Sequence, residues 1–237
     1  MMNFTGELLG TFILVLLGDG VVSACILNKT KAQNSGWIAI VLGWGIAVTV
    51  AVYISGFMSG AHLNPAVTLA MAAIGSLPWS QVVTYLVAQF LGAMLGALVL
   101  YLHYYPHWKE TKDAGTILAC FSTGPAIRHT WSNLLGEALG TAVLVITVMA
   151  IGPNKVAAGF GPIIVGFVVM AVGFSLGATT GYAINPARDL GPRIMHALLP
   201  IPNKGDSDWS YAWIPVLGPI LGGVVGALIY QVILNMM

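Results

Sequence analysis

The stretch Ser59-Gly-Ala-His-Leu-Asn-Pro-Ala-Val-Thr68 and the stretch Thr180-Gly-Tyr-Ala-Ile-Asn-Pro-Ala-Arg-Asp189 share one tripeptide, Asn64-Pro65-Ala66 in the first and Asn185-Pro186-Ala187 in the second. Each tripeptide predicts a helix start, because Asn suits the N-cap and Pro has no amide to satisfy at the first helical position. Both starts lie in a chain that is apolar almost throughout. A helix that begins inside a membrane requires its free backbone groups to line a watery cavity. The pair therefore indicates a protein that conducts a solute.

The composition indicates a multi-span membrane protein. The 237 residues are 57% hydrophobic and only 7% charged, whereas soluble domains carry roughly 25% charged residues. The net charge of +1 offers no basic patch for nucleic acid. The first apolar run lacks a basic leader and a small-residue cleavage site, so we expect a retained span.

Six stretches are long enough to cross a bilayer, which takes about 20 residues. We expect spans at Phe4–Ile26, Trp37–Phe57, Trp79–Leu102, Asn133–Ile151, Phe160–Ala178 and Ala212–Leu234. The runs Pro65–Ala73 and Pro186–Leu198 extend only about 14–20 Å as helices, against a core of about 30 Å. These two runs are predicted to be re-entrant half-helices.

The chain also repeats itself. Gly6-Glu-Leu-Leu-Gly-Thr11 matches Gly136-Glu-Ala-Leu-Gly-Thr141 at five of six positions, and the same order of spans follows each copy. We divide the single domain, residues 1–237, into a first repeat (1–102), a long connection that caps one face (103–132) and a second repeat (133–237). Three spans per repeat is an odd number, so the repeats are inverted, which places a functional site near the midplane. The half-helices should enter from opposite faces and meet at their N-termini.

Two facing helix starts would create a barrier to cations. Each N-terminus carries about +0.5 elementary charge, and two of them aimed at one point repel cations and protons. When the Asn64 and Asn185 side-chain oxygens cap their helices, the NH₂ groups are expected to be free to donate to a neutral solute.

Arg188 is the second feature of the site. It lies one turn after Asn185, so both side chains can face the same side. A charged side chain in the membrane costs about 2.5–3.5 kcal/mol on insertion scales and is a functional candidate. The matching residue of the first repeat is Val67, so Arg188 should mark one end of a pore. The alternative is a structural salt bridge, with Asp189 as a partner.

Two carboxylates, Glu7 and Glu137, occupy matching positions in the first and fourth spans. They could form a proton relay, as in a coupled transporter. We favour a second interpretation, in which each accepts hydrogen bonds from the amides of a non-helical loop. Asp19 has no mate in the second repeat, and the sequence suggests no role for it beyond a place near the outer end of the first span.

The two motifs resemble those of the major intrinsic proteins, the aquaporin superfamily, and the resemblance covers essentially the whole chain. Asp189, directly after the Arg, resembles the glycerol facilitator (aquaglyceroporin) branch. The resemblance implies an all-α membrane protein with six transmembrane helices and two re-entrant half-helices. It also implies a homotetramer in the lipid bilayer of the cell membrane, with no cofactor or metal.

The family's selectivity filter maps by resemblance onto Trp44, Gly173, Tyr182 and Arg188. Its ladder of pore-lining carbonyls maps onto Gly60, Ala61 and His62 in one loop and Gly181, Tyr182 and Ala183 in the other. Gly173 resembles the small residue that widens facilitator filters. Facilitators usually have Phe where this chain has Tyr182, so we expect a solute range that differs from the usual glycerol pattern.

The resemblance implies a passive channel rather than an enzyme. It should pass glycerol, dihydroxyacetone, urea, peroxide, neutral lactic acid and water, and it should exclude ions and protons. The alternatives are a water-selective channel and a proton-coupled transporter that uses Glu7 or Glu137. A membrane enzyme is the remotest alternative, because the chain offers no nucleophile–base pair or metal cluster at membrane depth.

The loop charges conflict with the family's orientation, in which both termini are cytoplasmic. That orientation puts one lysine, Lys155, inside the cell and places most basic loop residues outside. The outer set comprises Lys29, Lys31, Lys109, Lys112, Arg128 and Lys204. The positive-inside rule favours the opposite orientation.

Overall fold

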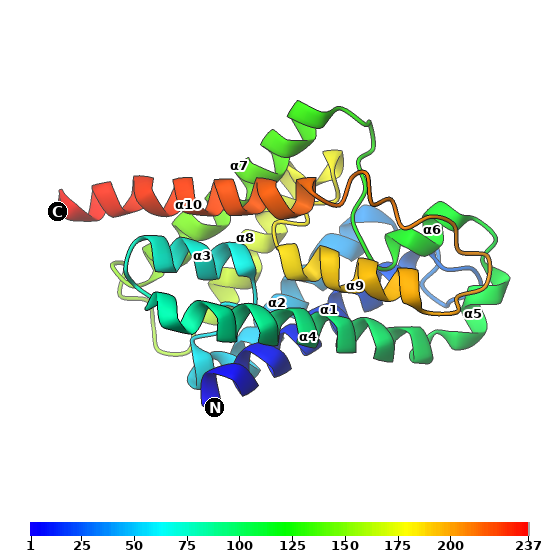
Figure 1. The fold of residues 1–237 in the computed structure, drawn as a ribbon, viewed down its shortest axis with the longest axis horizontal. Coiled ribbons are helices and arrows are strands. Elements are labelled where there is room, and N and C mark those ends of the chain that lie inside the picture. The colour runs from blue at the N-terminus through cyan, green and yellow to red at the C-terminus, as the bar shows by residue number, and fades with distance from the viewer. Residues whose placement is uncertain (237) are drawn as a thin grey trace.

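The computed structural model describes residues 1–236, which form helices and loops without any strand (Figure 1). The helices are α1 Met2–Ile26, α2 Gly36–Ser59, α3 Pro65–Ala73, α4 Trp79–His103, α5 Tyr105–Glu110, α6 Ala114–Ala119, α7 Thr130–Ile151, α8 Gly161–Ser175, α9 Pro186–Leu198 and α10 Ile214–Asn235, with a short 3₁₀ turn, η1, at Gly177–Thr179. Five of them are long and apolar enough to cross a membrane, and α8 is a shorter apolar helix. The six spans and both half-helices predicted from the sequence are present.

The fifth span ends earlier than predicted. We expected a helix over Phe160–Ala178, whereas α8 stops at Ser175 and the chain continues into η1. A Cβ atom on Gly177 would lie 2.4 Å from Cδ1 of Tyr182. The Tyr182 ring therefore packs directly on the backbone of this turn, and the chain leaves the α-helix where it passes that ring.

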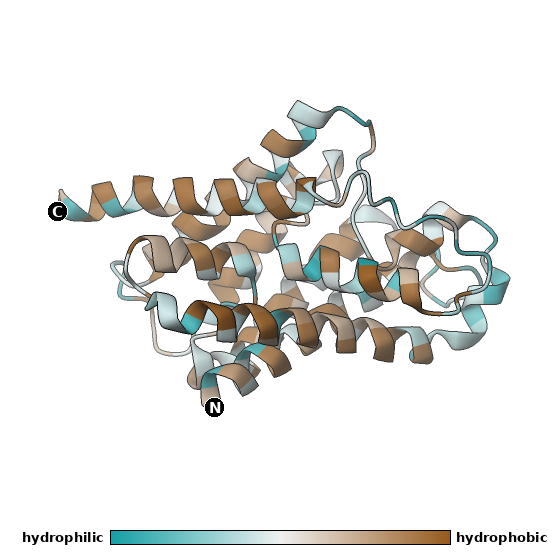
Figure 2. Ribbon diagram, viewed as in Figure 1, coloured by the Kyte–Doolittle hydropathy of each residue, from teal (hydrophilic) through white to brown (hydrophobic). Residues whose placement is uncertain are grey.

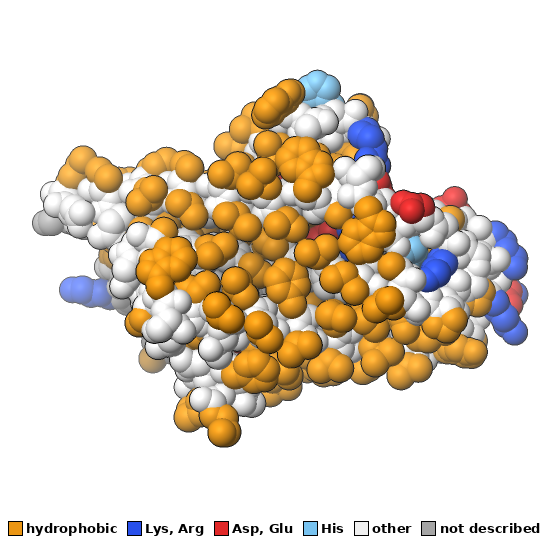
Figure 3. Space-filling view, in the orientation of Figure 1, with side chains coloured by type: hydrophobic (Ala, Val, Ile, Leu, Met, Phe, Trp, Pro, Cys, Tyr) orange, Lys and Arg blue, Asp and Glu red, His pale blue; other side chains and the backbone are white. Residues whose placement is uncertain are grey.

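The outer surface of the helices is apolar. Exposed side chains along the spans include Leu42, Phe57, Leu95, Phe167 and Leu221, and hydrophobic side chains cover the face seen in Figure 3. Hydropathy mapped on the ribbon shows the same bias, with the hydrophilic residues concentrated in the connections (Figure 2). This distribution suits helices whose surroundings are lipid tails.

Glycines allow the first and last spans of each half to pack closely. A Cβ on Gly92 of α4 would lie 2.4 Å from the carbonyl oxygen of Leu8 in α1. At the matching place in the second half, a Cβ on Gly222 of α10 would lie 1.9 Å from the carbonyl oxygen of Ala138 in α7. Small residues are favoured at such contacts because burial against lipid tails gives little driving force.

The half-helices α3 and α9 have the predicted bounds and lie end to end, with their N-termini facing each other (Figure 1). Each packs against the last span of the opposite half: α3 contacts α10, and α9 contacts α4. The two halves therefore interlock at the centre of the molecule.

The connection 103–132 packs at one end of the bundle (Figure 1). It contains α5 and α6, and its Trp108 and Phe121 side chains are fully buried. The Trp108 Nε1–H donates to the carbonyl oxygen of Tyr101, at 2.8 Å.

Candidate functional site

The facing helix starts are joined by the two asparagines. Each Asn side-chain oxygen caps its own helix: Oδ1 of Asn64 accepts from the Ala66 amide at 2.9 Å, and Oδ1 of Asn185 accepts from the Ala187 amide at 3.0 Å. Each NH₂ group then donates across the interface. The distances are 2.8 Å from Asn64 to the carbonyl oxygen of Ile184 and 2.7 Å from Asn185 to that of Leu63.

This arrangement corrects one expectation. The two NH₂ groups are not wholly free, because each donates one hydrogen bond to a carbonyl oxygen in the loop of the other half. Each NH₂ group has one hydrogen-bond acceptor among the described residues, so its second hydrogen is not engaged by them.

The two loops before the half-helices have the same unusual backbone. Left-handed conformations occur at matching positions: Gly60 (φ 80°), Ala61 (φ 50°) and Leu63 (φ 51°) in one loop, and Gly181 (φ 83°), Tyr182 (φ 39°) and Ile184 (φ 43°) in the other. Such conformations cost about 1–3 kcal/mol for a residue with a side chain and persist only where neighbouring groups fix them.

Glu7 holds the first loop. Its Oε1 accepts from the Ser59 hydroxyl at 2.6 Å and from the His62 amide at 3.0 Å. Its Oε2 accepts from the Leu63 amide and from Nε2 of Gln89, both at 2.7 Å. The carboxylate is fully buried and contacts four donors, all of them neutral.

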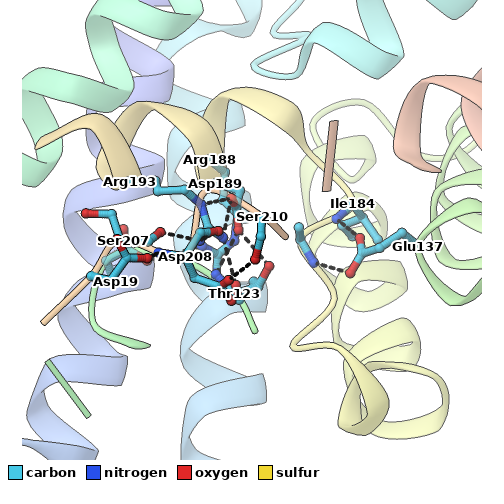
Figure 4. Close-up of polar contacts among 12 residues, drawn as sticks. Asp19, Thr123, Glu137, Ile184, Arg188, Asp189, Arg193, Ser207, Asp208 and Ser210 are labelled. Carbon is cyan, nitrogen blue, oxygen red and sulfur yellow. Dashed lines mark hydrogen bonds and ion pairs between the residues drawn. The ribbon is translucent and has the colours of Figure 1, made fainter. Parts of the chain in front are cut away.

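Glu137 holds the second loop in the same manner. Its Oε1 accepts from the Thr180 hydroxyl at 2.6 Å and from the Ala183 amide at 3.0 Å. Its Oε2 accepts from the Ile184 amide at 2.8 Å (Figure 4). Both carboxylates therefore bind the loop amides, which is the arrangement favoured over a proton relay.

An inner cavity of about 220 Å³ runs beside the meeting point of the half-helices. Both asparagines line it, and so do most of the predicted carbonyl residues. These are Gly60, Ala61, His62, Tyr182 and Ala183, joined by Leu63 and Ile184, which were not predicted. The remaining wall is apolar, with Val48, Val67 and Leu144 among its residues.

An outer cavity of about 290 Å³ lies next to it, toward the end capped by α6. Gly181 lines this outer cavity and not the inner one. Three residues line both cavities: Trp44, Tyr182 and Arg188. The structure thus brings three of the four predicted filter residues together where the two cavities meet.

Gly173, the fourth predicted filter residue, lines neither cavity. It is buried behind Tyr182, and a Cβ atom on it would lie 2.9 Å from Cζ of that ring. Its carbonyl oxygen accepts from Nε1 of Trp37 at 3.2 Å, and Trp37 also packs edge-on against Tyr182. Gly173 therefore acts on the passage indirectly, by leaving room for the Tyr182 ring.

Arg188 does not pair with Asp189, the partner named from the sequence. Its guanidinium lies over the Trp44 ring, with 4.2 Å from Cζ to the ring centroid. Its acidic neighbour is Asp19, at 3.5 Å from Nη1 to Oδ1. Asp189 and Arg188 are adjacent in a helix, so their side chains diverge.

Asp189 instead pairs with Arg193, one turn further along α9 (Figure 4). The carboxylate–guanidinium distance is 2.8 Å and both side chains are fully buried. Asp189 also accepts from the Thr123 amide at 2.7 Å, and Arg193 donates to the carbonyl oxygens of Thr123 and Ser207, each at 2.8 Å. This cluster ties α9 to the connection between the halves and to the loop before α10.

The sequence reasoning missed Gln89 and Arg193 and left Asp19 without a role. A count of charges would have pointed to two of them. The apolar part of the second half contains the cations Arg188 and Arg193, and each requires an acid within the membrane. Asp189 lies four residues before Arg193, which leaves Asp19 for Arg188.

Known proteins resemble this chain in sequence and in fold. The family model described as major intrinsic protein matches residues 1–230. Glycerol uptake facilitator protein 3 of Lactiplantibacillus plantarum is 59% identical over 98% of this chain and 97% of its own length. The glycerol uptake facilitator protein of Streptococcus pneumoniae strain R6 is 58% identical over 98% of this chain and 99% of its own length.

A solved structure agrees with these matches. The X-ray structure of the aquaglyceroporin from Plasmodium falciparum superimposes with a TM-score of 0.87 and 28% identity, covering 99% of this chain and 97% of that one. The chain is a multi-pass membrane protein with the aquaporin fold, and it belongs to the major intrinsic protein family, among relatives that are named glycerol uptake facilitators.

Proposed function

We propose that this protein is a passive channel of the cell membrane for glycerol and water. Dihydroxyacetone, urea, peroxide and neutral lactic acid are further solutes of the right size and polarity. The observation that carries the proposal is the junction of the two cavities at Trp44, Tyr182 and Arg188. Two aromatic rings offer an apolar surface for a carbon backbone, and the guanidinium offers fixed donors to hydroxyl groups.

The loops supply the rest of the path. Carbonyl groups of residues 60–63 and 181–184 can replace water around a solute step by step, and the remaining NH₂ hydrogens of Asn64 and Asn185 can donate to it. Because these groups are spread along the cavity, no single deep binding site forms, which suits rapid passage rather than retention.

The charges of the path support exclusion of cations and protons. Arg188 is the one charged side chain among the described residues that line either cavity. The two helix N-termini add about +0.5 elementary charge each at the midplane. A cation would meet positive potential from both sources, and no acid lines either cavity among the described residues.

A proton-coupled transporter is disfavoured by the surroundings of the carboxylates. Glu7 and Glu137 line neither cavity, and both oxygens of each are engaged by donors of the pore loops. We propose that they anchor the loops. We also propose that the filter consists of Trp44, Tyr182 and Arg188, with Gly173 behind it.

The inverted repeats 1–102 and 133–237 and a homotetrameric assembly are part of this proposal. For the orientation, we propose that the end with α5 and α6 faces outward. Several basic residues there are engaged: Lys29 pairs with Glu110 at 2.6 Å, and Nζ of Lys204 donates to three carbonyl oxygens at the end of α9. The proposal follows the family resemblance, whereas the count of loop charges still favours the opposite orientation.

The test is light scattering from vesicles that contain the purified protein, challenged with water and a panel of small solutes. We expect glycerol and water to enter faster than in protein-free vesicles. Fast water entry with glycerol entry at the protein-free rate would support a water-selective channel instead. Matched vesicles with Arg188→Val test the filter, because loss of its cation should relax discrimination among the solutes.

A further inference from the structure

The stretch Gly18-Asp19 of α1 lies behind the junction of the two cavities. The Asp19 side chain is fully buried, and its Oδ1 is 3.5 Å from Nη1 of Arg188. Its Oδ2 has no hydrogen-bond partner among the described residues. An acid at this depth is costly unless a cation compensates it, and Arg188 is the cation that the structure places beside it.

Gly18 adjoins Trp44, a second residue of the junction. A Cβ atom on Gly18 would lie 2.2 Å from Cζ3 of Trp44, so the indole rests directly on the α1 backbone. The Arg188 guanidinium lies over the same indole at 4.2 Å. Of two consecutive residues of α1, Gly18 thus contacts the Trp44 ring, and Asp19 contacts the Arg188 guanidinium that stacks on that ring.

We propose that Asp19 is a positioning residue for solute selection. It holds the Arg188 guanidinium against the Trp44 ring and balances its charge, which keeps the passage between the cavities open to a polyol. Asp19 lines neither cavity, so it acts through Arg188 and not on the solute. This role rests on the proposed function as a glycerol and water channel.

Among residues 1–236, Asp19 is the acid that pairs with Arg188, and the neighbouring Asp189 does not substitute for it. Asp189 is adjacent to Arg188 in sequence, but its carboxylate is engaged by Arg193 and Thr123. Loss of the Asp19 charge would therefore free the guanidinium to turn into the passage. A narrower passage would obstruct glycerol more than water, because water is the smaller molecule.

The test compares the ratio of glycerol to water permeability in vesicles for wild type, Asp19→Asn, Arg188→Val and the double variant. We expect Asp19→Asn to lower the ratio about tenfold, within the range by which small misplacements change rates. In the Arg188→Val background, Asp19→Asn should change the ratio by less than about twofold, because Asp19 then has no guanidinium to position. Only two independent sites would give the same fold-change in both backgrounds. Glu110→Gln, at an acid on the protein surface, is the matched control and should leave the ratio unchanged.

The outcomes separate the two proposals. A wild type that passes no glycerol contradicts the proposed function. A conducting wild type with an unchanged ratio in Asp19→Asn, or the same fold-change in both backgrounds, overturns the positioning role. If Asp19→Asn fails to fold, recovery of folded protein in the double variant supports the pairing, and failure of both variants overturns it.

Discussion

Ser59 and Thr180 occupy matching positions before the two half-helices, and each hydroxyl donates to a carboxylate at 2.6 Å, Ser59 to Glu7 and Thr180 to Glu137. The left-handed residues of the loops match as well. The backbone of the pore is therefore built twice from the same parts, with different side chains attached.

The half-helices that follow differ in charge. The positions of Val67, Thr68 and Ala72 in α3 are taken in α9 by Arg188, Asp189 and Arg193. Thr68 belongs to a neutral network, in which it accepts from Nε2 of Gln89 at 2.9 Å. In α9 the matching positions carry charged side chains: Arg188 pairs with Asp19 of α1, and Arg193 pairs with Asp189.

The difference shows how a duplicated scaffold can become asymmetric. Glu7 and Glu137 hold the two loops through matching contacts, whereas charged residues occur in one half-helix only, where Arg188 lies at the junction of the two cavities. We expect variants of the shared anchors to behave alike in the two halves and variants of the charged residues to behave differently.

The largest effect is expected from the ion pair in α9. Asp189→Asn leaves the buried Arg193 without its charge partner, which should lower the free energy of unfolding by about 3–5 kcal/mol. Thr68→Val, at the matching position in α3, removes a hydroxyl that contacts only neutral groups, those of Gln89, His62 and the Asn64 carbonyl, and should cost about 1–3 kcal/mol. Thermal unfolding in detergent compares the two variants, and equal losses would contradict the asymmetry.

The shared anchors should give intermediate and similar effects, because each carboxylate accepts from one loop hydroxyl and two loop amides, although Gln89 adds a fourth donor to Glu7 alone. Glu7→Gln and Glu137→Gln each replace one acceptor oxygen by an NH₂ group that faces the loop amides. Hydrogen bonds to a charged group contribute about 1.5–3 kcal/mol, so each variant should lose about 2 kcal/mol of unfolding free energy. The same unfolding assay measures both, and a strong loss in one half alone would show that the anchors are not equivalent.

A smaller effect is expected at Tyr182, whose counterpart in the first half is Ala61. The buried Tyr182 hydroxyl has no hydrogen-bond partner among the described residues, so Tyr182→Phe should not lower stability. It should change the relative permeability of glycerol and other small polar solutes by roughly twofold to fivefold, equivalent to about 0.4–1 kcal/mol. If every relative permeability in vesicles stayed the same, the proposed effect of this hydroxyl on the solute range would be wrong.

The smallest effect is expected at the surface, where Arg128 pairs with Asp208. Partial burial raises the pKa of Asp208, but hydrogen bonds and the charge of Arg128 outweigh it and lower the pKa overall. The pair therefore stabilises the fold above about pH 4 and loses its effect as the pH falls through the lowered pKa. Asp208→Asn should change the free energy of unfolding by less than about 1 kcal/mol at neutral pH, and a larger change in a pH series of unfolding curves would contradict this view.

Local signals in the sequence predicted much of the fold. Asn64-Pro65 and Asn185-Pro186 give the starts of α3 and α9 because capping depends on adjacent residues alone. The repeated Gly-Glu motif placed Glu7 and Glu137 at equivalent positions, which made loop anchoring a natural hypothesis. The end of α8 was predicted too late, because it depends on where the Tyr182 ring packs.

The pairing of charges could be predicted only in part. Asp189 and Arg193 are four residues apart on one helix, a spacing that favours contact. Asp19 and Arg188 are 169 positions apart, and their contact depends on how α1 packs against α9. Gly173 was assigned to the filter by resemblance, as the small residue that widens it, but that the Tyr182 ring occupies the space beside it is a detail that only packing determines.

The central claim is a path for uncharged solutes beside two opposed half-helices. It is tested most directly by measuring glycerol entry and internal pH together in the same vesicles, with and without an imposed proton gradient. The account predicts a rate of glycerol entry that rises in proportion to the glycerol concentration and is the same with and without the proton gradient. It also predicts that the internal pH does not change as glycerol enters. Saturable entry that stops when the gradient is collapsed, or proton flow that accompanies glycerol, would contradict it.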